Sequence, residues 1–218
     1  GVYWHLFPTY KQGKKIAWDG IRKDGIAFRA AFPDELVAGV NNTEMKVTFK
    51  NGSIYQVVGA DKPDSLVGAN PVGVVYSEWS LMSPFVREFL KPIFAENEGW
   101  ELFIYTPRGK NHGYKLLQTA KKNPKWFWQV LTVDDTKAVK QEVIDEDRKD
   151  GMSEAMIAQE YYCSFDAPVE GSYYGEHMKL ATDQERIGRI PWETALPVHT
   201  AWDLGMGDAT AIWFYQQY

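Results

Sequence analysis

The chain has 218 residues, of which 44% are hydrophobic and 15% aromatic, enough to build one core or two small ones. We expect neither wholesale disorder nor a membrane helix, because no apolar run approaches ~20 residues, and the first ten residues lack a signal-peptide pattern. The net charge of −5 excludes a surface that is basic throughout. The single cysteine, Cys163, excludes an internal disulfide and suits a reducing cytoplasm.

The first part of the chain predicts a strand, a helix and a hairpin. Residues 2–7 form a β-branched and aromatic run that ends before Pro8, and residues 10–22 place apolar side chains at helical spacing. Two further runs, 45–49 and 53–58, are joined by Asn51 and Gly52, a pair that favours the positive φ angles of a type I′ turn.

The middle of the chain predicts parallel strands with crossover helices. Residues 71–76 and 100–105 are short, continuous apolar runs, and each precedes a loop and a helical pattern. The elements expected next are a helix over 113–122, a strand over 126–133, a charged amphipathic helix over 136–149 that ends before Gly151, and a helix that Ser153 caps and that reaches residue 162.

The composition changes after residue 165, where prolines and glycines become frequent until a new strand at 199–203. We therefore predict a first domain over 1–165, a linker over 166–197 and the beginning of another domain over 198–218. The apolar run 209–218 has no partner element after it, so the chain reads as an internal excerpt of a longer protein.

The first candidate site is GVVYSEWSLM, residues 73–82, in which an apolar strand ends at Ser77 and Glu78. Ligands of open α/β sheets bind beyond the carboxyl ends of the strands. A carboxylate there can orient a water molecule for attack on a γ-phosphate, since phosphoryl transfer depends on positioning and electrostatics. A solvated glutamate at a strand end explains this motif equally well.

The second candidate is YTPRGKNHGY, residues 105–114, which also follows a strand and opens a helix. Thr106 offers a hydroxyl, and Arg108, Lys110 and His112 can meet phosphate oxygens. A basic loop of this kind can also be merely solvated. Because consecutive parallel strands end in adjacent loops, Glu78 and Thr106 are expected to face one nucleotide pocket. The sequence contains no phosphate-binding G-x-x-x-x-G-K-[ST] loop of its own.

The third candidate is AWDLGMGDATAIWFY, residues 201–215, with Asp203 at the end of one strand and Asp208 in a glycine-flanked turn. A carboxylate on the first strand of a hairpin can hold Mg²⁺ or Mn²⁺ in a two-metal nuclease, although further carboxylates are needed. Ordinary hairpin chemistry accounts for the glycines equally well.

In this order and spacing, the motifs resemble the terminase large subunit of tailed bacteriophages, over nearly the whole chain. YWHLFPTYKQGKKIAWDGI, residues 3–21, looks like the strand and helix that follow the Walker A loop in that family. GVVYSEWSLM resembles its Walker B segment, with Glu78 as the catalytic glutamate and Ser77 where many ATPases have a magnesium-orienting aspartate. YTPRGKNHGY is similar to the coupling motif, with Thr106 at its centre and Arg108 and Asn111 nearby.

The resemblance also implies how the rest of the chain is organised. EYYCSFDAPVEGSYYG, residues 160–175, looks like the junction between ATPase and nuclease, and residues 201–215 look like the first hairpin of a ribonuclease H-like nuclease. Asp203 is then the first metal ligand, and Asp208 is a weaker candidate. The implied fold is an incomplete P-loop-type α/β sheet, with the Walker A strand and loop upstream of Gly1.

The implied function is a subunit of the viral packaging motor, which hydrolyses ATP with Mg²⁺ to drive double-stranded DNA into the procapsid and cleaves it with Mg²⁺ or Mn²⁺. Its partners would be DNA, the portal protein, the small terminase subunit and further copies in a ring, in the host cytoplasm at the procapsid portal and without a membrane. The residues 1–218 alone are expected to be inactive. Possible DNA contacts are the basic residues after Thr106, although a solvent-facing helix explains them equally well: Lys110, Lys115, Lys121 and Lys122.

The sequence alone leaves two other interpretations of the function open. One is a helicase-like P-loop ATPase that moves along nucleic acid, with the C-terminal hairpin belonging to an unrelated domain. The other is an inactive interaction module from a degraded viral gene, which the missing phosphate loop favours if Gly1 is the true start.

Overall fold

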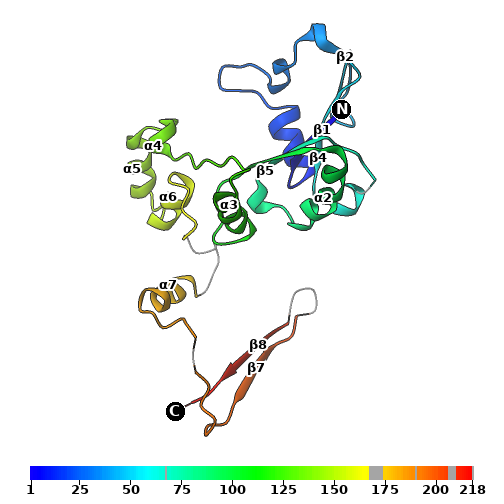
Figure 1. Cartoon of the computed structure of the whole chain (residues 1–218). Coiled ribbons are helices and arrows are strands. Elements are labelled where there is room, and N and C mark those ends of the chain that lie inside the picture. Colours follow the sequence, from blue (N-terminus) through cyan, green and yellow to red (C-terminus); the bar gives the residue numbers. More distant parts are fainter. Residues whose placement is uncertain (67, 167–173, 190, 206–209, 218) are drawn as a thin grey trace. The chain divides into compact units, whose positions relative to one another are not determined.

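A computed structural model describes residues 1–66, 68–166, 174–189, 191–205 and 210–217 (Figure 1). The chain divides into two compact units, residues 1–171 and residues 172–218. The division lies inside the predicted linker. In the described residues, no helix is both long and apolar enough to cross a membrane.

The first unit is built on a six-stranded, mixed sheet with the order β2-β3-β4-β1-β5-β6. The central pairs β4–β1, β1–β5 and β5–β6 are parallel, and β2–β3 and β3–β4 are antiparallel. The strands are β1 (Val2–Phe7), β2 (Val37–Asn41), β3 (Lys46–Phe49), β4 (Ile54–Gly59), β5 (Gly73–Ser77) and β6 (Trp100–Ile104). The mixed α/β architecture with a largely parallel sheet confirms the coarse fold expected from the sequence.

Side chains alternate between the two faces of the sheet. Trp4 and Leu6 of β1 pack with Val74 and Tyr76 of β5 under α2 (Phe85–Asn97), the crossover helix between β5 and β6. On the opposite face, Phe7 packs with α1 (Tyr10–Gly13) and the π-helical turn η1 (Lys14–Trp18), together with Val57 of β4. The predicted helix over 10–22 therefore ends at Trp18.

The hairpin β3–β4 exists as predicted, but the prediction that a type I′ turn joins its strands is wrong. Of the turn residues Lys50, Asn51 and Gly52, only Gly52 has a positive φ, 80°, whereas a type I′ turn needs two. The Gly52 amide donates to the Phe49 carbonyl at 2.9 Å, and the Phe49 amide donates to the Ser53 carbonyl at 2.8 Å. This is a three-residue loop in which a turn through Lys50 and Asn51 is followed by a glycine in the left-handed region, a geometry that also matches the twist of the strands.

The region after β6 departs further from the expectation. α3 (His112–Lys122) forms as predicted, but residues 126–132 run extended and pair with no strand among the described residues. The helix expected over 136–149 is interrupted because Lys137 adopts a left-handed φ of 51°. It is replaced by α4 (Val133–Thr136) and α5 (Gln141–Lys149), and both pack with α6 (Glu154–Glu160) through Val133, Ile144 and Ile157.

The end of α5 and the start of α6 agree with the sequence prediction. Gly151 has a φ of 100° just after α5. The Ser153 hydroxyl accepts the Met156 amide at 3.2 Å as the cap of α6, which ends at Glu160.

The second unit contains a helix that the sequence reading missed, α7 (Gly175–Asp183), and the hairpin β7–β8 (His199–Asp203 and Ala211–Tyr215). The two strands pair antiparallel with Asp203 opposite Ala211, so the predicted hairpin is confirmed. Every residue of both strands is exposed.

Candidate functional site

Glu78 follows β5 directly and adopts a left-handed backbone conformation, with φ 59° and ψ 42°. For a residue with a side chain this conformation costs roughly 1–2 kcal/mol. The residue also precedes the short 3-10 helix η5 (Trp79–Leu81), whose Leu81 amide donates to the Glu78 carbonyl at 2.9 Å. Strained backbone at the carboxyl end of a parallel strand points to a functional site.

The loop after β6 is tied to the Glu78 loop by three hydrogen bonds. Ser80 is only 5% exposed, and its hydroxyl donates to the Thr106 carbonyl at 2.7 Å. The Asn111 side-chain amide donates to the Ser80 carbonyl at 2.9 Å, and His112 Nε2 donates to the Trp79 carbonyl at 2.8 Å. Asn111 also accepts the Gly113 amide at 2.9 Å as the cap of α3. The two strand-tip loops therefore form one hydrogen-bonded structure.

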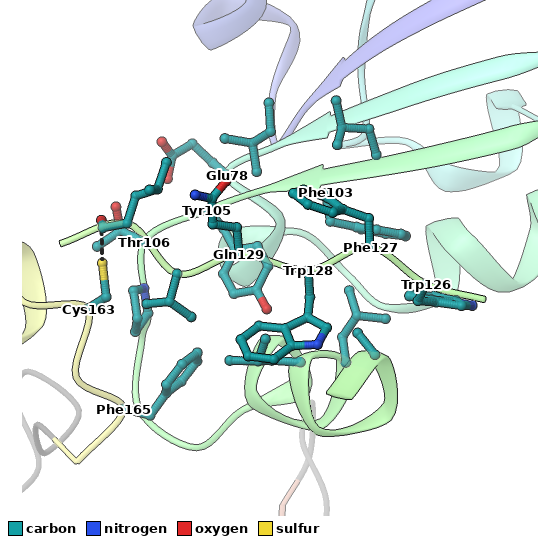
Figure 2. A pocket seen from close by; sticks show the side chains of 18 of the residues that line it. Glu78, Phe103, Tyr105, Thr106, Trp126, Phe127, Trp128, Gln129, Cys163 and Phe165 are labelled. Atoms are coloured by element: carbon teal, nitrogen blue, oxygen red, sulfur yellow. Dashed lines mark hydrogen bonds between the residues drawn. The ribbon is translucent and has the colours of Figure 1, made fainter. Parts of the chain in front are cut away.

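Glu78 and Thr106 line the same cavity, which has a volume of about 490 Å³ (Figure 2). Its other walls come from β6, α3, the extended residues 126–131 and residues near the end of α6, and they are largely apolar or aromatic. The parallel pairing of β5 and β6 brings the two tips together as the sequence indicated. The chemical roles of Glu78 and Thr106 stay predictions.

The cations of the coupling motif have carboxylate partners in this structure. Arg108 forms an ion pair with Glu160, and Lys110 lies 2.8 Å from Asp166. Lys115 and Lys122 are exposed on α3, and the Lys121 ammonium lies 5.1 Å from the centre of the Trp128 ring. That these side chains meet phosphate oxygens or DNA stays a prediction.

Ser77, the last residue of β5, has a partner that sequence reasoning missed. His5 of β1 contacts the Ser77 hydroxyl through Nε2 at 2.7 Å and the Tyr55 hydroxyl through Nδ1 at 3.0 Å. The available signal was a single histidine inside the apolar run VYWHLF. Its partners could not be read from that run, because Tyr55 and Ser77 lie 50 and 72 residues away in the sequence.

The candidate nuclease residues lie in the second unit. Asp203 ends β7, while Asp208 lies outside the described residues. Within the described part of the chain, no three His, Cys, Asp or Glu side chains gather in a way that could hold a metal ion. Further ligands would therefore have to join Asp203.

A search of protein-family models and a search of curated proteins found no match. Solved structures do match. The large-terminase ATPase domain of Thermus phage P74-26 aligns with a TM-score of 0.60 and 20% identity over 76% of both chains. The large terminase of a thermophilic bacteriophage in complex with ADP aligns with a TM-score of 0.61 and 14% identity over all of this chain, and its complex with ATP-γ-S with a TM-score of 0.57 and 13% identity.

These alignments show that the chain has the fold of phage large terminases. It spans 76% of the P74-26 ATPase domain but only 52% of the ADP-bound large terminase. At identities of 20% and below, the likeness establishes architecture, and function has to be argued from the site.

Proposed function

We propose that this chain is part of a phage large terminase that hydrolyses ATP to drive double-stranded DNA into a procapsid. The observation that carries the proposal is the meeting of Glu78 and Thr106 in one cavity, at the adjacent tips of two parallel strands. The shared fold with large terminases, some of them solved with ADP or ATP-γ-S, supports it.

In this proposal Glu78 orients and activates the water that attacks the γ-phosphate. Ser77 and Glu78 are oxygen donors, which fit the water shell of a magnesium ion held mainly by the nucleotide. The bound ion would neutralise charge on the phosphates. Thr106 senses the phosphate state, and Arg108 and Asn111 belong to the same coupling loop, which is already hydrogen-bonded to the Glu78 loop.

The phosphate loop has to come from outside this sequence, and β6 offers a place for it. Parallel strands are normally covered on both faces, yet Trp100, Leu102 and Ile104 on one face of β6 are 49%, 45% and 53% exposed. No described strand pairs with the outer edge of β6. We propose that a strand and helix carrying the Walker A loop complete the P-loop-type sheet there, between β6 and residues 126–131, both of which line the cavity.

Substitution of Glu78 tests the ATPase. In the full-length protein, Glu78→Gln keeps the size of the side chain and removes its charge, so we expect hydrolysis to fall by at least about 10²-fold with nucleotide affinity unchanged. Phosphate release and binding of a fluorescent ATP analogue measure the two quantities. Wild-type turnover in this variant would remove Glu78 from the mechanism.

Glu98→Gln is the matched control. Glu98 is also a glutamate with a left-handed backbone, φ 50°, at the end of α2, but it is exposed where Glu78 is half-buried, and it does not line the cavity. We expect its variant to hydrolyse ATP normally. Protection of DNA from nuclease by procapsids then separates a packaging motor from a helicase-like ATPase, which would not fill procapsids.

We further propose that β7–β8 opens a ribonuclease H-like nuclease in which Asp203, with Asp208 as a weaker candidate, binds Mg²⁺ or Mn²⁺. The motor would work as a ring of copies with the portal protein and the small terminase subunit, in the host cytoplasm at the procapsid portal. Basic side chains such as Lys115 and Lys122 would contact DNA phosphates, which makes binding dependent on salt and nearly independent of sequence.

Substitution of Asp203 tests the nuclease separately. Asp203→Ala in the full-length protein should abolish metal-dependent nicking of plasmid DNA and leave ATP hydrolysis unchanged, because a metal ligand is lost from a different unit. The exposed Asp183→Ala in α7 is the control and should cut normally. If the Asp203 variant nicks plasmid DNA as fast as the wild type, Asp203 is not a metal ligand and has only a structural role.

A further inference from the structure

The side chain of His5 connects two hydroxyl groups on neighbouring strands. His5 lies in β1, between β4, which carries Tyr55, and β5, which ends at Ser77. Its Nδ1 is 3.0 Å from the Tyr55 hydroxyl and its Nε2 is 2.7 Å from the Ser77 hydroxyl. The Phe7 ring centre lies 4.5 Å from that of His5 and restricts the imidazole further. The imidazole is therefore fixed on both of its nitrogens.

This imidazole is neutral near pH 7, because burial lowers the pKa of His5 to about 4. A neutral imidazole has one donor and one acceptor nitrogen. If Tyr55 donates to Nδ1, Nε2 donates to Ser77; in the other tautomer both hydrogen bonds reverse. Either arrangement fixes the position of the Ser77 oxygen, in the residue that precedes Glu78.

A serine at this position needs such a partner more than an aspartate would. An aspartate presents two oxygens from a planar group, whereas a serine presents one oxygen whose direction depends on its χ1 and hydroxyl rotations. Ordering a side chain costs conformational entropy, which a hydrogen bond already present before ligand binding offsets. The 2.7 Å contact from His5 supplies that order.

We propose that His5, supported by Tyr55, is a positioning residue that aims the Ser77 hydroxyl at the water shell of the nucleotide-bound magnesium ion. This inference rests on the proposed ATPase function. It assigns to three residues on three adjacent strands the task that one carboxylate performs in other ATPases. It also gives a histidine outside the strand-tip loops a role in nucleotide binding.

Two amide substitutions at His5 test this role. Glutamine can place a polar atom near the position of Nε2 and keep the bond to Ser77, whereas asparagine reaches only the position of Nδ1 and keeps the bond to Tyr55. Affinity for fluorescent ADP is measured in the full-length protein with Mg²⁺ and, separately, with EDTA. We expect His5→Asn to weaken Mg²⁺-dependent binding about fivefold, the size of one neutral hydrogen bond, and His5→Gln, which loses only the bond to Tyr55, to weaken it by a smaller factor.

Binding in EDTA should be equal in all three proteins, because the Ser77 hydroxyl acts only through the ion. Tyr55→Phe removes one hydroxyl and little volume, so it carries the test if His5→Asn fails to fold; it should shift binding in the same direction by a smaller factor. Equal losses in His5→Asn and His5→Gln, losses that persist in EDTA, or no loss in any variant would overturn the inference. A wild-type protein that binds no nucleotide would instead overturn the proposed function.

Discussion

The left-handed backbone of Glu78 leads to a prediction about stability that does not depend on the role of Glu78 in ATP hydrolysis. Glycine adopts this conformation without strain, whereas alanine does not. We expect Glu78→Gly to be more stable than Glu78→Ala by about 1 kcal/mol, as measured by denaturant unfolding. At Glu146, which is exposed within α5, the order should reverse, because glycine costs about 1 kcal/mol relative to alanine in a helix. If the glycine and alanine variants had the same order of stability at both positions, the backbone of Glu78 would not be strained.

The sequence located some residues of the candidate site and missed others for a physical reason. Glu78 and Thr106 were found because each directly follows an apolar run, and strand ends are where polar side chains can act. His5 was missed because its two partners lie on strands that are neighbours only in space. The ion pair of Arg108 with Glu160 was missed for the same reason, since the two residues are 52 positions apart.

At the scale of elements, Trp126 anchors the start of the extended residues 126–132. The Trp126 ring is stacked on Phe103, with centroids 6.4 Å apart and planes at 7°, and the Arg87 guanidinium lies 5.2 Å from its centre. Arg87 in turn pairs with Glu101 at 2.9 Å. Trp126 therefore attaches this segment to the packing around β6 and α2, although no strand pairs with it among the described residues.

Alanine substitutions should separate this anchor from its neighbour. We expect Trp126→Ala to lower the free energy of unfolding by roughly 2 kcal/mol, because stacking and burial are lost. Phe127, the next residue, is 85% exposed, and its alanine variant should lie within about 0.5 kcal/mol of wild type. Chemical denaturation measures both. Similar small effects at the two positions would mean that Trp126 does not anchor the segment.

Helices and strands that a short sequence pattern specifies could be predicted. Those that depend on contacts with residues distant in the sequence could not. The Ser153 cap and the strands of the parallel sheet follow from patterns within a few residues. Residues 126–133 carry strand-forming side chains, but a strand also requires a partner for its backbone, which the described chain does not provide. The break at Lys137 has no comparable signal, because lysine rarely adopts positive φ.

At the scale of the whole molecule, the two units differ in how well they are stabilised. The first unit has buried clusters on both faces of its sheet, whereas every strand residue of β7 and β8 is exposed. An isolated two-stranded hairpin is marginally stable. We therefore expect amides of β7 and β8 to exchange with deuterium within seconds in residues 1–218, while those of β1 and β5 stay protected.

Hydrogen exchange followed by mass spectrometry measures this difference directly, with the peptides of β1 as the internal reference. Protection of the hairpin equal to that of β1 would show that the hairpin is stable without further strands. In the full-length protein, the proposed nuclease domain should bring protection to both strands.

The three hydrogen bonds between the loops at Ser80, Thr106 and Asn111 have a mechanical consequence. They favour movement of the two loops as one unit, since separating the loops would leave the buried Ser80 hydroxyl without its acceptor. In the proposed ATPase, a shift of Glu78 on loss of the terminal phosphate would therefore also move the first turn of α3, because Asn111 and His112 begin that helix. If the proposed function holds, movement would thus begin at the hydrogen bonds between the tips of two neighbouring strands.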